Sequence, residues 1–146
     1  MENVMKILEL NLKKRWFDLV FNDLKKEEYR SLSNYWASRL MKYEFRGHNG
    51  AKLTDSEIES SLTHNLDILQ ITEKDFRQID YIHFKNGWKR KDGTPAPNFY
   101  IELKGIRIDE GVFFWGAVPG KKYFVLELGK IMKSITELEE IFKEIL

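Results

Sequence analysis

The first forty residues show a strand pattern and a helical pattern, followed by the same two patterns in shorter form. Residues 5–12 alternate loosely between apolar and polar side chains, which predicts a strand. Apolar side chains at helical spacing predict a helix within 13–24, and the short segment 27–30 suits a second strand. Ser33-Asn34 offers an N-cap for a second helix that runs to about Lys42.

The segment 44–75 departs from these patterns, since it is polar and acidic. Gly47-His48-Asn49-Gly50 has the composition of a loop. Thr54-Asp55-Ser56-Glu57 can form a capping box at the start of a short helix. We expect 44–75 to be an insertion or a lid with modest local stability.

Strand patterns dominate the chain from Phe76 onward. Three segments predict strands: 76–85, 99–108 and 123–128. Asn86-Gly87 and Asp92-Gly93 are hairpin signals between the first two of them. Residues 134–146 place their apolar side chains on one helical face, which predicts a C-terminal helix.

The order of these elements predicts an α+β fold in a single domain, 1–146. Late strands joined by hairpins imply an antiparallel sheet or a small β-barrel, with the early helices packed against it. The aromatic loop Phe113-Phe114-Trp115 is expected to plug the core, whereas an exposed arrangement would indicate an interface.

Composition narrows the class of protein. The chain has 146 residues, of which 42% are hydrophobic and 14% aromatic, so it can bury a core. Cysteine is absent, which excludes disulfides, thiol catalysis and cysteine-ligated zinc. No apolar run approaches the ~18 residues of a membrane span, so we expect a cytoplasmic protein without a membrane partner. His48, His64 and His83 lack metal-ligand spacing, and no metal or cofactor is expected.

Charge is informative through its distribution. The net charge is only +1, which does not by itself indicate a polyanionic partner. Basic side chains nevertheless concentrate in 13–30 and in 85–91, while acidic ones concentrate in 55–75 and near the C-terminus. A nearly neutral protein with two basic segments can still bind phosphate locally.

Lys25, Glu28 and Arg30 form the most informative group of charged residues. They lie between the predicted first helix and the short strand. In an extended strand Glu28 and Arg30 point to the same face, and Lys25 can join them from the loop. Two cations beside one carboxylate keep all three charged, and such a trio can hold a phosphate or the edge of a nucleobase. On pattern alone, a solvated run of charges at a helix end is the more frequent outcome.

These residues also match a family signature. The ASCH domain (activating signal cointegrator homology) has the signature G-x-K-x-x-E-x-R between a strand with its following helix and a second strand. The chain resembles this signature, with Lys25, Glu28 and Arg30 in the K, E and R positions. Asp23 stands in the glycine position, which is a departure. The similarity to bacterial and phage ASCH proteins covers about 6–128, with 44–75 the least matched part. It runs through Leu10–Asp18, Glu27–Arg30, Tyr35-Trp36, Arg39-Leu40, Ile101–Ile108, Trp115–Ala117 and Pro119-Gly120.

The resemblance implies a PUA-like fold, which is a small mixed or antiparallel β-barrel with flanking helices and a cleft lined by the motif. It implies an RNA- or nucleotide-binding module. The alternative is a hydrolase acting on RNA or on a modified nucleoside such as an N-acylcytidine, with Lys25 and Glu28 as catalytic candidates. Small bacterial relatives hydrolyse N4-acetylcytidine with the motif lysine and a threonine nucleophile. Glu28 replaces that threonine, so only a general-base role for its carboxylate is conceivable here.

Five other residues are candidate ligand contacts: Tyr29, Trp36, Lys14, Lys104 and Trp88. Tyr29 and Trp36 can each stack on a base or pack a helix against the barrel. Trp88 lies in a basic hairpin and suits a contact with single-stranded nucleic acid, but an exposed tryptophan in a solvated loop is equally expected. Lys14 and Lys104 can face the same cleft as the motif. No oligomeric state is predicted.

Overall fold

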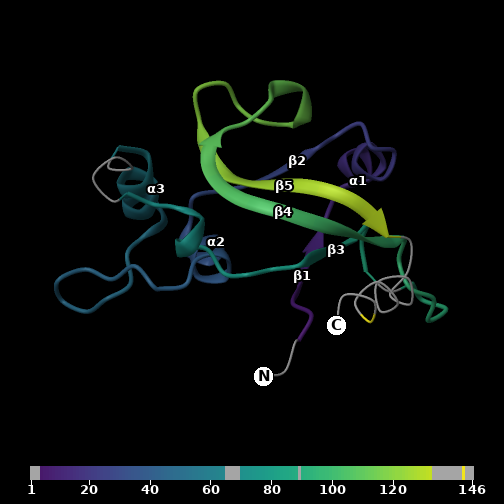
Figure 1. Ribbon diagram of the computed structural model, residues 1–146, viewed down its shortest axis with the longest axis horizontal. Coiled ribbons are helices and arrows are strands. Elements are labelled where there is room, and N and C mark those ends of the chain that lie inside the picture. Colours follow the sequence, from purple (N-terminus) through teal and green to yellow (C-terminus); the bar gives the residue numbers. More distant parts are fainter. Residues whose placement is uncertain (1–3, 65–69, 89, 133–142, 144–146) are drawn as a thin grey trace. The chain divides into compact units, whose positions relative to one another are not determined.

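The computed structural model describes residues 4–64, 70–88, 90–132 and 143. The predicted C-terminal helix over 134–146 lies outside these residues, apart from Lys143. Five strands form one sheet in the order β1-β3-β4-β5-β2 (Figure 1). Their bounds are β1 Ile7–Asn11, β2 Glu27–Arg30, β3 Tyr81–Lys85, β4 Asn98–Glu110 and β5 Lys122–Met132.

The sheet is mixed. β1 pairs with β3 in parallel, and β3 pairs with β4 antiparallel, as a hairpin requires. The helices are α1 (Lys14–Phe21), α2 (Asn34–Leu40) and α3 (Asp55–His64), with single 3-10 turns at Glu73–Asp75 and Phe113–Trp115. The predicted α+β class with a mixed sheet is therefore confirmed.

The chain divides into two compact units. The first unit contains Met1–Lys26, Gln78–Lys104 and Glu127–Leu146, and the second contains Glu27–Arg77 and Gly105–Leu126. The two longest strands, β4 and β5, therefore each contribute residues to both units. Both units are built from segments that are far apart in the sequence.

Phe99 is the centre of the core of the first unit. It is fully buried, and Phe99, Ile101 and Leu103 alternate with less buried side chains along β4. The register places Phe84 of β3 opposite Phe99, at 5.7 Å between ring centroids. From α1, Phe17 meets Phe99 edge-on at 4.9 Å, so the helix is packed on the sheet through aromatic rings.

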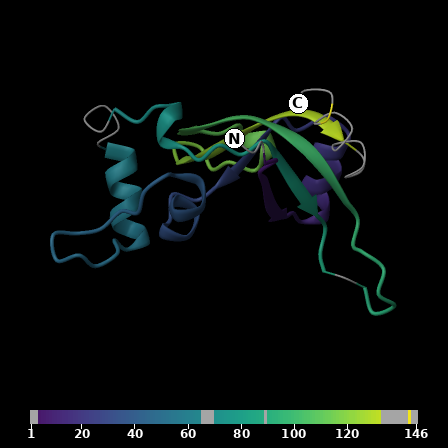
Figure 2. The same ribbon diagram turned by 60° about the horizontal axis from the view of Figure 1, so that its bottom comes forward.

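The connection between β3 and β4 is a long hairpin loop. Figure 2 shows it projecting beyond the ends of both strands. The backbone N–H of Asn86 donates to the carbonyl of Pro97 at 2.9 Å, which closes the base of the loop. Near its tip, the N–H of Gly93 donates to the carbonyl of Arg90 at 2.9 Å, so both predicted turn segments do lie between the strands.

The core of the second unit includes α3, from the segment expected to be an insertion or lid. Thr54 Oγ1 accepts from the backbone N–H of Glu57 at 3.2 Å, and the Glu57 carboxylate accepts from the N–H of Thr54 at 3.1 Å. The predicted capping box is thus confirmed. Ile58 and Leu62 of α3 are fully buried. The lid itself stays a prediction.

The predicted aromatic plug is wrong. Phe113 is 66% exposed and Phe114 is 80% exposed, on the 3-10 turn between β4 and β5. Successive side chains of a 3-10 turn point about 120° apart, so three consecutive aromatic residues cannot all face one core. Connecting loops also lie on the surface, where backbone groups can be hydrated.

A transmembrane helix is not found in the described part of the chain, because no helix there combines sufficient length with sufficient apolar character.

Candidate nucleic-acid interface

Arg30 and Trp36 form the centre of a candidate interface in the second unit. Arg30 ends β2, and Ser33 caps α2 by accepting from the backbone N–H of Trp36 at 3.3 Å. This short connection places the Arg30 guanidinium 4.9 Å from the centroid of the Trp36 ring. The distance is that of a cation–π contact, so the guanidinium is held over the indole.

Two further side chains extend this contact along α2. The Tyr35 ring meets Trp36 edge-on at 4.8 Å, and the Arg39 guanidinium lies 3.4 Å from the centroid of the Tyr35 ring. Arg39 also donates to the carbonyl of Tyr35 at 3.0 Å. Arg30, Trp36, Tyr35 and Arg39 are called the arginine–aromatic cluster below. Its two rings lie between two cations, and Tyr35 is 54% exposed.

Glu28 lies on β2 two residues before Arg30 and places a negative charge close to the Arg30 guanidinium. Burial lowers the pKa of Arg30 from its ordinary value, and the Glu28 carboxylate counteracts this by raising it. This electrostatic interaction is the one expected for residues two apart on a strand. Glu28 is itself buried, and its Oε1 accepts from the backbone N–H of Tyr29 at 3.0 Å. Arg30 stays charged at neutral pH, because an arginine titrates far above it.

Tyr29 takes part in the packing of the second unit. Its hydroxyl donates to Glu27 Oε1 at 2.7 Å and accepts from the backbone N–H of Val112 at 2.8 Å. Its ring lies 5.6 Å from that of Tyr123. Burial is the largest cause of a raised pKa of the Tyr29 phenol, and the Glu27 carboxylate adds to it. These contacts account for Tyr29 without a ligand.

Lys25 lies in the first unit and is 1% exposed. The Lys25 ammonium lies 5.7 Å from the centroid of the Trp16 ring, and Trp16 belongs to the first turn of α1. Exclusion of a lysine from water is costly unless the charge finds partners, so its burial is a specific feature of this fold. The predicted cleft of Lys25, Glu28 and Arg30 involves residues of both units, and it stays a prediction.

The other three predicted contacts also belong to the first unit. Lys14 is exposed and pairs with Asp18 at 2.7 Å, and Lys104 is exposed on β4. Trp88 is 84% exposed on the loop between β3 and β4. The structure therefore groups Glu28, Arg30 and Trp36 in one unit.

Tyr35 and Arg39 were not among the residues predicted for the site. Their i, i+4 spacing on a helix was the available signal, since such side chains are neighbours on the helix surface. Only the contact of Trp36 with Arg30 from another element distinguishes them as a cluster.

Comparison with protein-family models, with curated proteins and with solved structures finds no match for the chain. Within the described residues, no group of three or more histidine or acidic side chains is arranged to hold a metal ion. The geometry of the side chains is therefore the basis for assigning a function.

Proposed function

We propose that the protein binds RNA or a nucleotide through the arginine–aromatic cluster and Glu28. The observation that carries this proposal is the Arg30 guanidinium held 4.9 Å over the Trp36 ring. A stacked guanidinium keeps its planar fork of donors in one orientation, which suits a phosphate or the edge of a base. The neighbouring rings offer surfaces on which bases can stack.

The chemistry of the cluster matches the phosphate and the base of a nucleotide. Arg30 and Arg39 can bind phosphate by charge-assisted hydrogen bonds. Tyr35 is exposed and can stack on a base. Glu28 is buried beside Arg30, and its carboxylate raises the pKa of the guanidinium and so supports the charge that binds phosphate. A ligand with a base and a phosphate is therefore favoured over a simple anion.

The resemblance to ASCH proteins supports the same proposal from the sequence. On those grounds we propose that the fold is PUA-like, that Lys25 also contributes to binding, and that the protein is a cytoplasmic one of bacterial or phage type. The mixed sheet with helices is the coarse architecture that such a fold requires.

Fluorescence anisotropy with a labelled single-stranded RNA at low salt tests the proposal. Arg30→Ala and Trp36→Ala should each weaken binding about tenfold or more, since stacking alone contributes about 1–3 kcal/mol per base. Arg46→Ala is the matched control, because Arg46 is an arginine of the same unit paired with Glu44 outside the cluster. Raising the salt concentration should weaken wild-type binding as counterion release is lost. Equal affinities of Arg30→Ala and Arg46→Ala would contradict the proposal.

A double-mutant cycle tests the contribution of Lys25. Lys25→Met keeps most of the buried volume and removes the charge. If Lys25 and Arg30 bind one ligand, the two substitutions should be non-additive in the binding free energy by at least about 0.5 kcal/mol. Additive losses would separate Lys25 from this site.

The hydrolase is the alternative function. If the protein is a hydrolase, the wild type should turn over RNA or an acylated cytidine, and Glu28→Gln should not. Chromatography of the reaction products measures this turnover. RNA binding without turnover would leave the binding module as the function.

A further inference from the structure

Trp88 is exposed on the loop between β3 and β4, close to the point where hydrogen bonds hold the start of this loop in place. Asn86 donates from its side chain to the carbonyl of Leu12 at 2.9 Å, and the backbone N–H of Leu12 donates to the carbonyl of Lys85 at 2.8 Å. Gly87 follows with a φ of 95°, a left-handed conformation that glycine adopts without strain. The next residue, Trp88, is 84% exposed. A large apolar side chain is rarely exposed to water at a loop position that hydrogen bonds hold in place.

Trp88 borders two hollows of the first unit. One has a volume of about 330 Å³ and is lined by Trp88, Pro95 and Ala96 together with His83, Lys85 and Asn98. The other has a volume of about 350 Å³, and Asn11, Lys13 and Asn86 are among its lining residues, with Trp88 again. Each volume lies at the lower end of the range for small-molecule sites, which suits a single base with its sugar.

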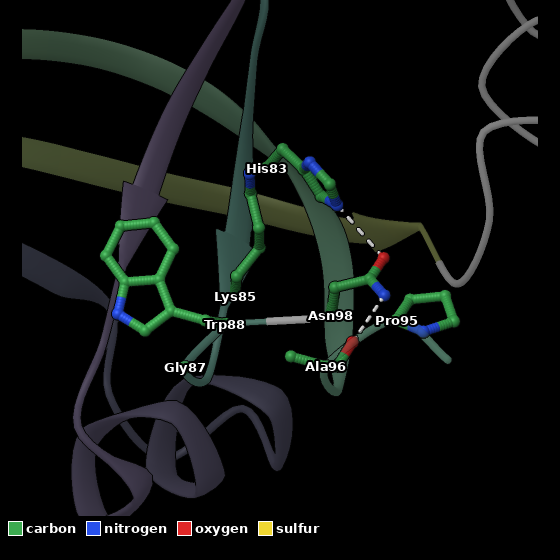
Figure 3. A pocket seen from close by; sticks show the side chains of 7 residues that line it. All are labelled: His83, Lys85, Gly87, Trp88, Pro95, Ala96 and Asn98. Carbon is green, nitrogen blue, oxygen red and sulfur yellow. Dashed lines mark hydrogen bonds between the residues drawn. The ribbon is translucent and has the colours of Figure 1, made fainter. Parts of the chain in front are cut away.

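The polar wall of the first hollow is already hydrogen-bonded. His83 interacts through Nδ1 with Glu9 at 2.7 Å and through Nε2 with Asn98 Oδ1 at 2.9 Å. The Asn98 amide donates to the carbonyl of Ala96 at 2.9 Å. Figure 3 shows His83, Asn98 and Ala96 on one side of the pocket and the Trp88 indole on the other. The His83 ring also lies parallel to Tyr100 at 4.1 Å. Groups so engaged offer little for reading the edge of a base.

The charge around Trp88 is basic. Lys13 and Lys85 each line one hollow, and Arg90 and Lys91 follow on the same loop. The acidic groups nearby are engaged, since Glu9 pairs with Lys85 at 3.1 Å as well as with His83, and Asp92 of the loop accepts two hydrogen bonds from Thr94. An exposed ring with a lysine in each adjoining hollow is complementary to a stacked base with its phosphates.

We propose that Trp88 is a stacking platform for single-stranded nucleic acid, with one nucleotide in each of the two hollows. Lys13 binds the phosphate on one side, and Lys85, which also pairs with Glu9, binds the phosphate on the other. Because the polar wall is committed to internal hydrogen bonds, the platform binds with little base preference. This site lies within the first unit, and its existence does not depend on the arginine–aromatic cluster of the second.

Anisotropy titrations with labelled oligouridylate, oligothymidylate and an RNA duplex test the platform. Trp88→Ala should weaken binding of both single strands about tenfold, and Trp88→Phe should retain most of the affinity because a ring remains. The duplex should bind more weakly, since its bases are already stacked. Phe114→Ala is the matched control, because Phe114 is 80% exposed and belongs to the second unit. Lys13→Gln should lower the salt slope by about one, whereas Lys52→Gln in the second unit should not.

The same titrations in Arg30→Ala separate this inference from the proposed function. The Trp88→Ala effect should persist in that background. The platform is overturned if Trp88→Ala binds single strands as wild type does while its circular dichroism is unchanged. It is also overturned if the duplex binds as tightly as the single strands, or if an aromatic peptide binds at Trp88 while no oligonucleotide does.

Discussion

Asp23 shows how one residue fixes the turn that leads to Lys25. Its φ is 62°, in the left-handed region, directly after the end of α1. The N–H of Asp23 donates to Val20 and that of Leu24 donates to Leu19, at 3.0 and 2.9 Å. This is a Schellman motif, in which glycine is the preferred residue. Asp23 therefore lies at a position where glycine is favoured, and aspartate tolerates the same conformation at a cost.

Substitution of Asp23 should reveal this cost. Asp23→Gly should raise the free energy of unfolding by about 0.5–1 kcal/mol, since the left-handed strain disappears. Asp23→Val should lower it by about 1–2 kcal/mol, because a β-branched side chain is poorly accommodated there. Both variants lose the ion pair of Asp23 with Lys26, so that contribution cancels in their comparison. Urea denaturation measures the difference, and equal stabilities would show that the turn is unstrained.

Tyr29 should make the second unit sensitive to alkali. Its pKa is raised in the folded protein, mainly by burial, above the ordinary value of 10.0. Stability from the neutral phenol is thus fully present below about pH 10 and is lost as the pH rises toward the folded pKa. Tyr29→Phe should cost about 1–2 kcal/mol near neutral pH, because the bonds to Glu27 and Val112 disappear. Its stability should also fall less than that of wild type above pH 10, as denaturation at several pH values can measure.

At the scale of elements, α3 combines a local start signal with a buried face. The capping box of Thr54 and Glu57 satisfies backbone and side-chain groups at its N-terminus. The helix is connected to α2, since Asn34 donates to the Asp55 carboxylate at 2.8 Å and to the carbonyl of Leu53 at 3.1 Å. Local signals therefore start the helix, while contacts with α2 hold it in place.

The start of α3 should fray in acid. The hydrogen bonds from Thr54 hold the pKa of Glu57 below its ordinary value. The charged carboxylate therefore stabilises the helix start above the pKa of an unfolded glutamate, and this contribution is lost as the pH falls through the lower folded pKa. Amide hydrogen exchange over 54–58 should accelerate relative to its intrinsic rate below about pH 4. Glu57→Gln should remove this dependence, whereas Glu59→Gln, an exposed change on the same helix, should preserve it.

At the scale of the whole molecule, the two units share strands. β4 and β5 each run from one unit into the other, so unfolding of one unit disrupts strands whose remaining residues belong to the second unit. We therefore expect both units to unfold in one cooperative transition.

Leu62→Ala tests this cooperativity. Leu62 is fully buried in the second unit, and its truncation should cost about 2–5 kcal/mol. Amide exchange should then accelerate at Ile101 of the first unit as well as at Phe124 of the second. Ile82→Ala, a buried change in the first unit, should have the reciprocal effect. Protection lost only in the unit that carries the substitution would show two independent folding units.

The sequence by itself determined the elements whose signals are local. Apolar spacing located β1 and α1, the short segment 27–30 was predicted as β2, and the N-cap at Ser33 and the capping box of Thr54 with Glu57 located the starts of α2 and α3. These predictions succeeded because strand and helix periods and caps depend on residues a few positions apart. The charge pattern singled out Lys25, Glu28 and Arg30, but not that the Trp36 ring would lie against Arg30.

Only the tertiary structure decided which distant residues meet. The parallel pairing of β1 with β3, the contact of Arg30 with Trp36 and the exposure of Phe113 all depend on how chain segments return to one another. Periodicity says which face of an element is apolar but not what covers it. Trp88 is an example, because its surroundings are formed by Lys13 and Asn98, from different parts of the chain.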